Sequence, residues 1–172
     1  MKKIQWNFLK FCIFILINHK NSVLNNLDYK IYTDGACLRN PGPGGWAVLI
    51  ISTNQSKEKK FGGESYTTNN RMELTAVIQA LKSIPIKSTL ALYTDSKYVI
   101  NGINTWIVNW KKSKWIGSNK KEVKNKDLWI ELDTLIQDFN IQWNWVKGHS
   151  GDTNNEVVDK LARNEALKLD LS

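Results

Sequence analysis

The sequence predicts an α/β domain built on one five-stranded mixed sheet, with helices on both faces of the sheet. Three β-prone segments come first and are separated only by turn-rich stretches, which favours antiparallel pairing of the first three strands. Two further strands then alternate with helical segments, which favours strands that run parallel to the first one. A chain of 172 residues with 42% hydrophobic residues suffices for one domain with its own core and is short for two.

The first half of the domain contains the expected hairpins. Its strands are predicted at residues 29–33, 46–51 and 58–66. The first of them alternates in polarity and ends at Asp34-Gly35. The Pro- and Gly-rich segment 40–45 predicts a turn before the second strand, and residues 52–56 predict the turn before the third.

The second half alternates strands with helices. Strands are predicted at 89–94 and 141–146, and helices at 70–83, 106–115, 126–137 and from Thr153 onward. Ser96 is expected to cap the helix that follows the fourth strand, and residues 153–156 fit a capping box. One face of the first helix is apolar, because its hydrophobic residues recur at helical spacing: Leu74, Val77, Ile78 and Leu81.

The domain is expected to cover residues 28–172, after an N-terminal extension over residues 1–27. The extension begins like a signal peptide, with lysines before an apolar run, but Lys10 interrupts the run and no small-residue cleavage site follows. The run is also too short to span a bilayer. We therefore expect no stable membrane association, and we expect an extension that is disordered or that reflects a start codon assigned too far upstream.

The cysteine content favours a reducing compartment. The chain has two cysteines, which cannot build a disulfide framework, and only two histidines to complete a zinc site with them. We therefore expect a cytoplasmic protein without structural disulfides.

Most of the net positive charge lies in one segment. Residues 106–126 contain seven lysines and one glutamate, which is a net +6 of the formal +8 of the whole chain. A concentrated basic patch is typical of proteins that bind a polyanion, although charge alone leaves open a lysine-rich face that contacts only solvent. Within or beside this segment, Trp115 is expected to be exposed, whereas Trp106, Trp110 and Trp129 are expected to pack between helices.

Four carboxylates occupy positions that could converge. Asp34 and Asp95 each close a predicted strand, while Glu73 and Asp159 lie near the beginnings of two helices. A single carboxylate at a strand end is most often solvated or a helix cap, but four that converge would repel one another unless cations neutralised them. Oxygen ligands without a thiolate or imidazole set select Mg²⁺ or Mn²⁺, and two such ions can clamp a phosphodiester displacement.

Four motifs resemble those of type 1 ribonuclease H, the kind found in bacteria. In chain order they are Thr33–Gly45, Thr67–Leu74, Thr94–Val99 and Trp145–Gly151. They occur in the order of that family, and the resemblance extends from residue 29 to residue 169. It implies the ribonuclease H-like fold and an endonuclease that hydrolyses the RNA strand of an RNA–DNA hybrid, leaving 5′-phosphate and 3′-hydroxyl ends. We expect a monomer, because activity on a linear duplex does not need symmetry.

The resemblance also implies roles for individual residues. The catalytic set is Asp34, Glu73, Asp95, His149 and Asp159; the four carboxylates would bind two Mg²⁺ ions, with Mn²⁺ as a substitute, and the histidine would assist proton transfer or product release. The expected substrate contacts are Cys37, Asn40, Asn69 and Asn70 in the minor groove, Thr68 and Asn109 on the DNA strand, Lys97, and the basic protrusion at 106–126 with Lys111, Lys112, Lys114 and Trp115.

The chain departs from the family pattern at two places. Lys97 stands where glutamine is common, and Val157-Val158 replaces a more polar pair before Asp159. Neither change removes an expected metal ligand.

Three other interpretations remain. One is an integrase- or resolvase-like enzyme on the same fold, which would lack the Asn-Pro-Gly-Pro-Gly-Gly run. Another is a ribonuclease H domain detached from a reverse transcriptase. The third is a non-catalytic hybrid-binding module, which loss of a carboxylate would indicate.

Overall fold

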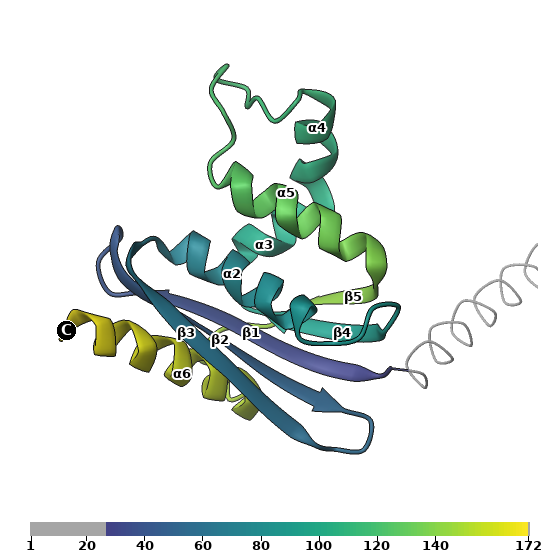
Figure 1. The fold of residues 1–172 in the computed structure, drawn as a ribbon, viewed down its shortest axis with the longest axis vertical. Helices are drawn as coiled ribbons and strands as arrows, with labels where there is room; N and C mark the ends of the chain where they lie inside the picture. The colour runs from purple at the N-terminus through teal and green to yellow at the C-terminus, as the bar shows by residue number, and fades with distance from the viewer. Residues whose placement is uncertain (1–26, 172) are drawn as a thin grey trace, which may run out of the picture.

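The strands form one sheet in the order β3-β2-β1-β4-β5 in a computed structural model that describes residues 27–171 (Figure 1). β1 pairs antiparallel with β2, and β2 with β3, while β4 and β5 run parallel to β1. The expected mixed sheet is therefore confirmed. Most of the expected extension, residues 1–26, lies outside the described residues. The strands are β1 Tyr29–Cys37, β2 Gly42–Ser52, β3 Lys57–Thr67, β4 Thr89–Thr94 and β5 Asn140–Trp145.

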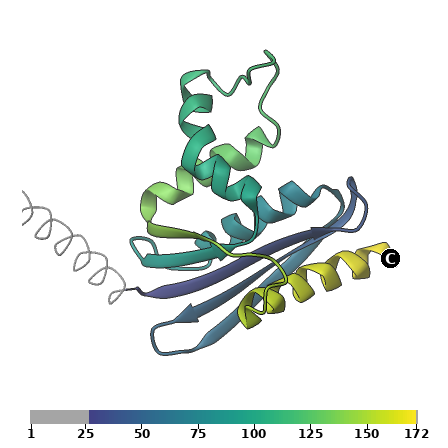
Figure 2. The ribbon, with the colours of Figure 1, turned by 180° about the vertical axis from the view of Figure 1, so that it is seen from behind.

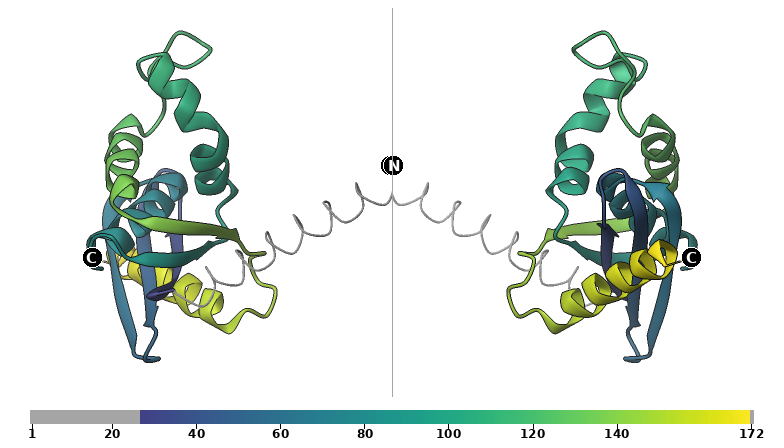
Figure 3. Two further views of the ribbon diagram at one scale, coloured as in Figure 1. Left: turned by 90° about the vertical axis from the view of Figure 1, so that its right-hand side faces the viewer. Right: turned by 90° about the vertical axis from the view of Figure 1, so that its left-hand side faces the viewer.

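The helices divide between the two faces of the sheet. α6 packs against β1, β2 and β3 on one face, and α2 packs against β1 and β2 on the other, with α5 against α2. Figure 3 shows α6, in yellow, on the side of the sheet away from the other helices. The helices are α2 Asn69–Lys82, α3 Lys97–Asn101, the π-helical turn η1 Gly102–Trp106, α4 Ile107–Lys112, α5 Lys126–Leu135, the 3₁₀ turn η2 Ile136–Asp138 and α6 Thr153–Asp170.

Two hydrophobic cores follow from the alternation of side chains along the strands. In β2, Val48 and Ile50 face the core under α2, whereas Ala47, Leu49 and Ile51 face the core under α6. Because both faces of β2 are covered, its apolar run is almost continuous. The predicted apolar face of α2 is confirmed, since all four of its expected members are buried: Leu74, Val77, Ile78 and Leu81.

The Gly-rich run before β2 does more than turn the chain. The turn prediction for residues 40–45 was too long, because β2 already begins at Gly42. A Cβ atom added to Gly45 would lie 2.2 Å from the carbonyl oxygen of Ala162 in α6. Gly45 therefore lets the backbone of α6 approach the sheet closely.

Three helix boundaries differ from the predictions. The helix predicted at 106–115 is the last part of a continuous helical run from Lys97 to Lys112, and it ends because Lys114 and Trp115 adopt positive φ angles. α5 ends at Leu135, before the 3₁₀ turn η2. The cap of α6 is Asp152, whose carboxylate accepts hydrogen bonds from the backbone N–H groups of Asn154 and Asn155.

The helical run and the loop that follows it form a projection. Figures 1 and 2 show α4 and the loop after it extending away from the sheet. None of the helices in residues 27–171 has the length and apolar character needed to cross a membrane.

Replacement of Gly45 by alanine is expected to lower the free energy of unfolding by about 1–3 kcal/mol, because α6 must move away from β2 to admit the new methyl group. Urea denaturation followed by circular dichroism measures this change. The control is Gly117→Ala in the exposed loop, where the nearest atom to an added Cβ is a side-chain oxygen of Asn119 at 3.3 Å, and we expect a change below about 0.5 kcal/mol. Equal effects of the two substitutions would show that the approach of α6 to β2 is not tight.

Candidate active site

The parallel pairing of β1 with β4 brings two of the predicted carboxylates together. Thr33 of β1 lies opposite Thr94 of β4, so Asp34 and Asp95 follow at neighbouring positions of the same sheet edge. α2 supplies Glu73 and α6 supplies Asp159, and all four side chains line one open pocket together with Cys37 and Asn69. The convergence expected for the four carboxylates is present.

Gly35 explains how α2 comes so near to this sheet edge. A Cβ atom at Gly35 would lie 2.3 Å from the backbone nitrogen of Glu73. The absence of a side chain therefore lets the first turn of α2 lie directly against β1, next to Asp34.

Burial and mutual repulsion raise the pKa values of these carboxylates. Asp34 is only 7% exposed, and its burial, followed by the charge of Asp95, raises its pKa to about 8. Burial raises the pKa of Glu73 to about 7, although hydrogen bonds from Ser96 and Asn69 act in the opposite direction. The pKa of Asp95 is also raised, mainly by burial. The pocket therefore strongly favours a cation or a proton.

The donor set suits a hard divalent cation. The four carboxylates offer oxygen ligands, and their proximity creates the repulsion that a dication relieves. Within residues 27–171, however, no three Asp, Glu, His or Cys side chains already form a ligand cluster. Both oxygens of the Glu73 carboxylate are hydrogen-bonded, because Oε1 accepts from Asn69 Nδ2 at 2.8 Å and the other oxygen accepts from the Ser96 hydroxyl.

Several residues that hold Asp95 in place were not identified from the sequence. The buried side chain of Asn155 hydrogen-bonds to the Asp95 carboxylate, and the indole N–H of Trp145 donates to the Asp95 carbonyl at 3.0 Å. A Cβ on Gly148 would lie 2.6 Å from Asp95 Oδ2, so the segment after β5 lies directly over this carboxylate. Asn155 was expected only in the capping box of α6, and Trp145 only within a motif.

His149 lies beside Asp159, one of the carboxylates that line the pocket. Its side chain is exposed, its φ angle is +52°, and its Nδ1 atom is 3.9 Å from Asp159 Oδ2. It is thus placed beside the carboxylates without being fixed by burial, which suits the predicted part in moving a proton.

The residues predicted to contact the minor groove, and Thr68 predicted to contact the DNA strand, lie at or next to the same pocket, which Cys37 and Asn69 line. Cys37 lines it, with its thiol donating to the Arg39 carbonyl at 2.7 Å. The side-chain oxygen of Asn40 accepts from the backbone N–H of Asn69 at 3.1 Å, which ties the turn after β1 to the start of α2. Thr68 is the N-cap residue of α2, and Asn70 is exposed one residue beyond Asn69.

Lys97 lies on another side of the site. Its ammonium group is 5.3 Å from the centre of the Trp145 ring, and both side chains are exposed. The same Trp145 ring lies beside Asp95, because its indole N–H donates to the Asp95 carbonyl.

The predicted contacts of the basic protrusion lie apart from the pocket. Asn109, Lys112 and Lys114 are exposed on α4 and the loop after it, whereas Lys111 forms an ion pair with Asp133 of α5, with an N–O distance of 2.8 Å. The expectation of an exposed Trp115 is wrong: it is half-buried and packs on Trp110, with ring centres 6.3 Å apart. Its positive φ turns it back onto the helices. Packing between helices is confirmed for Trp110 of α4 and Trp129 of α5, whose ring centres are 5.5 Å apart. The ring contacts of Trp106 are with Tyr98 and Trp110 of its own helical run.

Comparisons with known proteins agree with this fold. The RNase H family profile matches residues 26–167. The ribonuclease H of Orientia tsutsugamushi (strain Boryong) is 52% identical over 157 residues, which is 90% of this chain and 93% of the relative. The ribonuclease H of Francisella tularensis subsp. novicida (strain U112) is 53% identical over 138 residues, or 80% of this chain and 90% of the relative.

Solved structures show the same architecture. LC9-RNase H1, a type 1 RNase H with the type 2 active-site motif, aligns with a TM-score of 0.74 and 30% identity, covering 82% of this chain and 72% of that chain. LC11-RNase H1, solved in complex with an RNA/DNA hybrid, aligns with a TM-score of 0.62 and 20% identity over 84% of this chain and 99% of that chain, and shows the fold alone.

The mixed sheet with an acidic pocket at its edge defines an α/β nuclease. The chain belongs to the ribonuclease H family, as its four motifs led us to expect, and it is a nuclease of that family. Enzymes of this family generally depend on divalent metal ions.

Asp34→Asn is expected to stabilise the metal-free protein at high pH. The folded-state pKa of Asp34, about 8, lies above its ordinary value of 3.8. The wild type therefore loses stability as pH rises from about 4 through 8, because the folded state must release a proton that it holds more tightly than the unfolded chain. The asparagine variant has no proton to release at this position. In EDTA its free energy of unfolding should therefore exceed that of the wild type by a few kcal/mol at pH 9, and by much less at pH 5.

Urea denaturation at several pH values in EDTA measures this difference. The control is Asp138→Asn at an exposed position in η2, which should change stability equally at both pH values. If Asp34→Asn followed the wild-type pH dependence, the buried carboxylate would not be protonated at neutral pH.

Proposed function

We propose that this nuclease hydrolyses the RNA strand of RNA–DNA hybrids. The observation that carries the proposal is the convergence of Asp34, Glu73, Asp95 and Asp159 in one pocket. The hybrid bound to LC11-RNase H1 belongs to a protein with the same fold, and it supports the same class of substrate for this chain. The products would carry 5′-phosphate and 3′-hydroxyl ends.

The four carboxylates would hold two Mg²⁺ ions during catalysis, and Mn²⁺ would substitute. When bound, the cations supply the positive charge that activates water and stabilises the leaving 3′-oxygen. The four carboxylates fit this task because they provide only oxygen donors and because their mutual repulsion is relieved on binding.

The chain's own residues prepare this site. Ser96 and Asn69 orient the Glu73 carboxylate, while Asn155 and Trp145 hold the side chain and the backbone of Asp95. Such preorganisation lowers the cost of assembling charge around the phosphate. His149, exposed beside Asp159, would take up or deliver a proton as the product leaves.

Discrimination between RNA and DNA would come from short polar groups next to the pocket. Cys37, Asn40, Asn69 and Asn70 would contact the minor groove, where the 2′-hydroxyls of the RNA strand are displayed. Thr68, Asn109 and Lys97 would contact the sugar–phosphate backbones, and the basic protrusion at 106–126 would bind phosphates of the DNA strand. We propose that residues 28–172 form the catalytic domain and that it acts as a cytoplasmic monomer.

A substrate panel tests the proposal. With Mg²⁺, the protein should cut the RNA of an end-labelled RNA–DNA hybrid and leave single-stranded RNA, RNA duplex and DNA duplex intact. EDTA should abolish the reaction, and Asp34→Asn should lower kcat by about 10³-fold or more because a ligand charge is lost. Asp138→Asn is the matched surface control and should retain full activity.

Hybrid binding without cleavage by the wild type would point to a non-catalytic module. Cleavage of DNA duplex would contradict the proposed substrate. Full activity of Asp34→Asn would contradict the proposed metal ligands.

The lysines of the basic protrusion should differ in their contribution to binding. Lys112 and Lys114 form no ion pair with the described residues, whereas Lys111 is held by Asp133. Each of Lys112→Ala and Lys114→Ala should raise KM and reduce the slope of log K against log salt by about 1, because one phosphate contact is lost. Lys111→Ala should change that slope less. Fluorescence anisotropy with a labelled hybrid at several salt concentrations measures the slopes. Equal slopes for the wild type and the three variants would show that these lysines do not contact the phosphates.

A further inference from the structure

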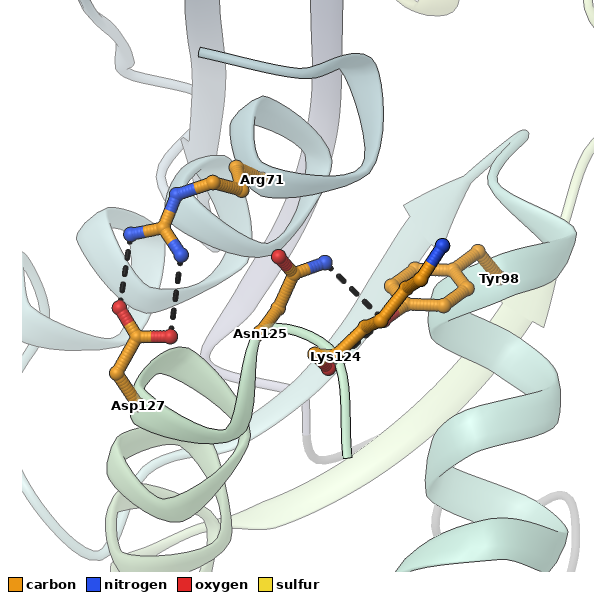
Figure 4. A network of polar contacts seen from close by, with 5 residues as sticks. All are labelled: Arg71, Tyr98, Lys124, Asn125 and Asp127. Carbon is orange, nitrogen blue, oxygen red and sulfur yellow. Dashed lines mark hydrogen bonds and ion pairs between the residues drawn. The ribbon is translucent and has the colours of Figure 1, made fainter. Parts of the chain in front are cut away.

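Arg71 lies within the second motif but has no part in the proposed chemistry. Its guanidinium makes two hydrogen bonds with the carboxylate of Asp127, at 3.1 and 2.8 Å (Figure 4). This bidentate pair connects α2 to the first turn of α5, where the chain returns from the basic protrusion. The pair also lowers the pKa of Asp127, chiefly through the hydrogen bond from Arg71.

Tyr98 provides a second attachment at the same point of the chain. Its hydroxyl accepts a hydrogen bond from Asn125 Nδ2 at 3.2 Å and donates to the Lys124 carbonyl at 3.5 Å (Figure 4). It also accepts from the indole N–H of Trp129 at 2.9 Å. Trp129 is fully buried, so this hydroxyl joins the end of the loop to a rigid part of the core.

Both attachments begin next to a candidate metal ligand. Arg71 lies two residues before Glu73 on α2, and Tyr98 lies three residues after Asp95 at the start of α3. The loop between α4 and α5 is carried away from the pocket by the helical run 97–112, whose 16 residues rise roughly 24 Å. Other contacts also hold this loop, since Val123 is buried in the core and Trp115 packs on Trp110, but the two attachments are the ones that begin beside candidate metal ligands.

We propose that Asp127 and Tyr98 are positioning residues that hold the basic protrusion at a fixed distance from the catalytic carboxylates. The protrusion would bind DNA-strand phosphates at a set spacing from the phosphodiester that is cut in the RNA strand. This inference rests on the proposed hybrid substrate. Asp127 and Tyr98 would thus determine the position of cleavage along the hybrid, without touching the reacting atoms.

A second ion pair between α2 and α5 provides a control that distinguishes an effect on positioning from an effect on stability. Lys82 of α2 and Glu131 of α5 lie 2.5 Å apart, with side chains 47% and 39% exposed. The Arg71–Asp127 pair is similarly exposed, at 30% and 61%, so neither pair adds much stability. Only Asp127 lies directly after the loop; Glu131 is one helical turn further along α5.

The experiment compares Asp127→Asn with Glu131→Gln on a hybrid of about 20 base pairs. Asp127→Asn should raise KM about three- to tenfold, with kcat within about twofold of the wild type, and should spread the cleavage positions near each end of the hybrid. Glu131→Gln should retain the wild-type KM and cleavage pattern. Asp127→Glu keeps a carboxylate within reach of Arg71 and should restore both.

A binding measurement and a variant of Tyr98 test the positioning role independently of cleavage by Asp127→Asn. The Kd for a fluorescent hybrid can be measured in EDTA, where no cleavage occurs. This Kd should rise for Asp127→Asn and stay at the wild-type value for Glu131→Gln. Tyr98→Phe should act in the same direction as Asp127→Asn, and the exposed position of Asp127 guards against a variant that fails to fold. Identical KM values, Kd values and cleavage patterns for Asp127→Asn and Glu131→Gln would overturn the positioning role, whereas a wild type that cuts no hybrid would instead contradict the proposed function.

Discussion

Parallel pairing between β1 and β4 sets the place of the whole acidic site. Because Thr33 lies opposite Thr94, the next residue on each strand is an aspartate, and Asp34 and Asp95 meet at one edge of the sheet. Burial of Asp34 there is unfavourable for a charged carboxylate, which is why its pKa is raised to about 8. The site is therefore organised around repulsion that a divalent cation would relieve.

Close backbone contacts then bring the other two carboxylates to this edge. Gly35 allows α2 to lie against β1 beside Asp34, and Gly45 allows α6 to lie against β2. Glu73 and Asp159 are delivered by these two helices from opposite faces of the sheet. Glycines that a local interpretation assigns to turns thus act through packing, because the absence of a Cβ lets a helix approach the sheet.

The basic protrusion combines a rigid base with exposed charge. Trp110, Trp115 and Trp129 pack together at its base, and Tyr98 bonds to both Trp129 and the returning chain. The exposed Lys112 and Lys114 are carried on this support, whereas Lys111 is already paired with Asp133. The distinction matters for function, because a lysine held by a carboxylate has less charge to offer a phosphate than one that faces only solvent.

The sequence by itself determined the order of strands and helices, the apolar face of α2, the four carboxylates and the family. These features depend on local periodicity and on residue motifs, which are readable along the chain. Contacts between distant segments were decided only by the tertiary structure. The bond from Trp145 to Asp95 joins residues 50 positions apart, and Arg71 and Asp127 are 56 apart. The inward turn of Trp115 depended on its positive φ and on the helices that receive it, because local sequence does not specify which distant surface a side chain will meet.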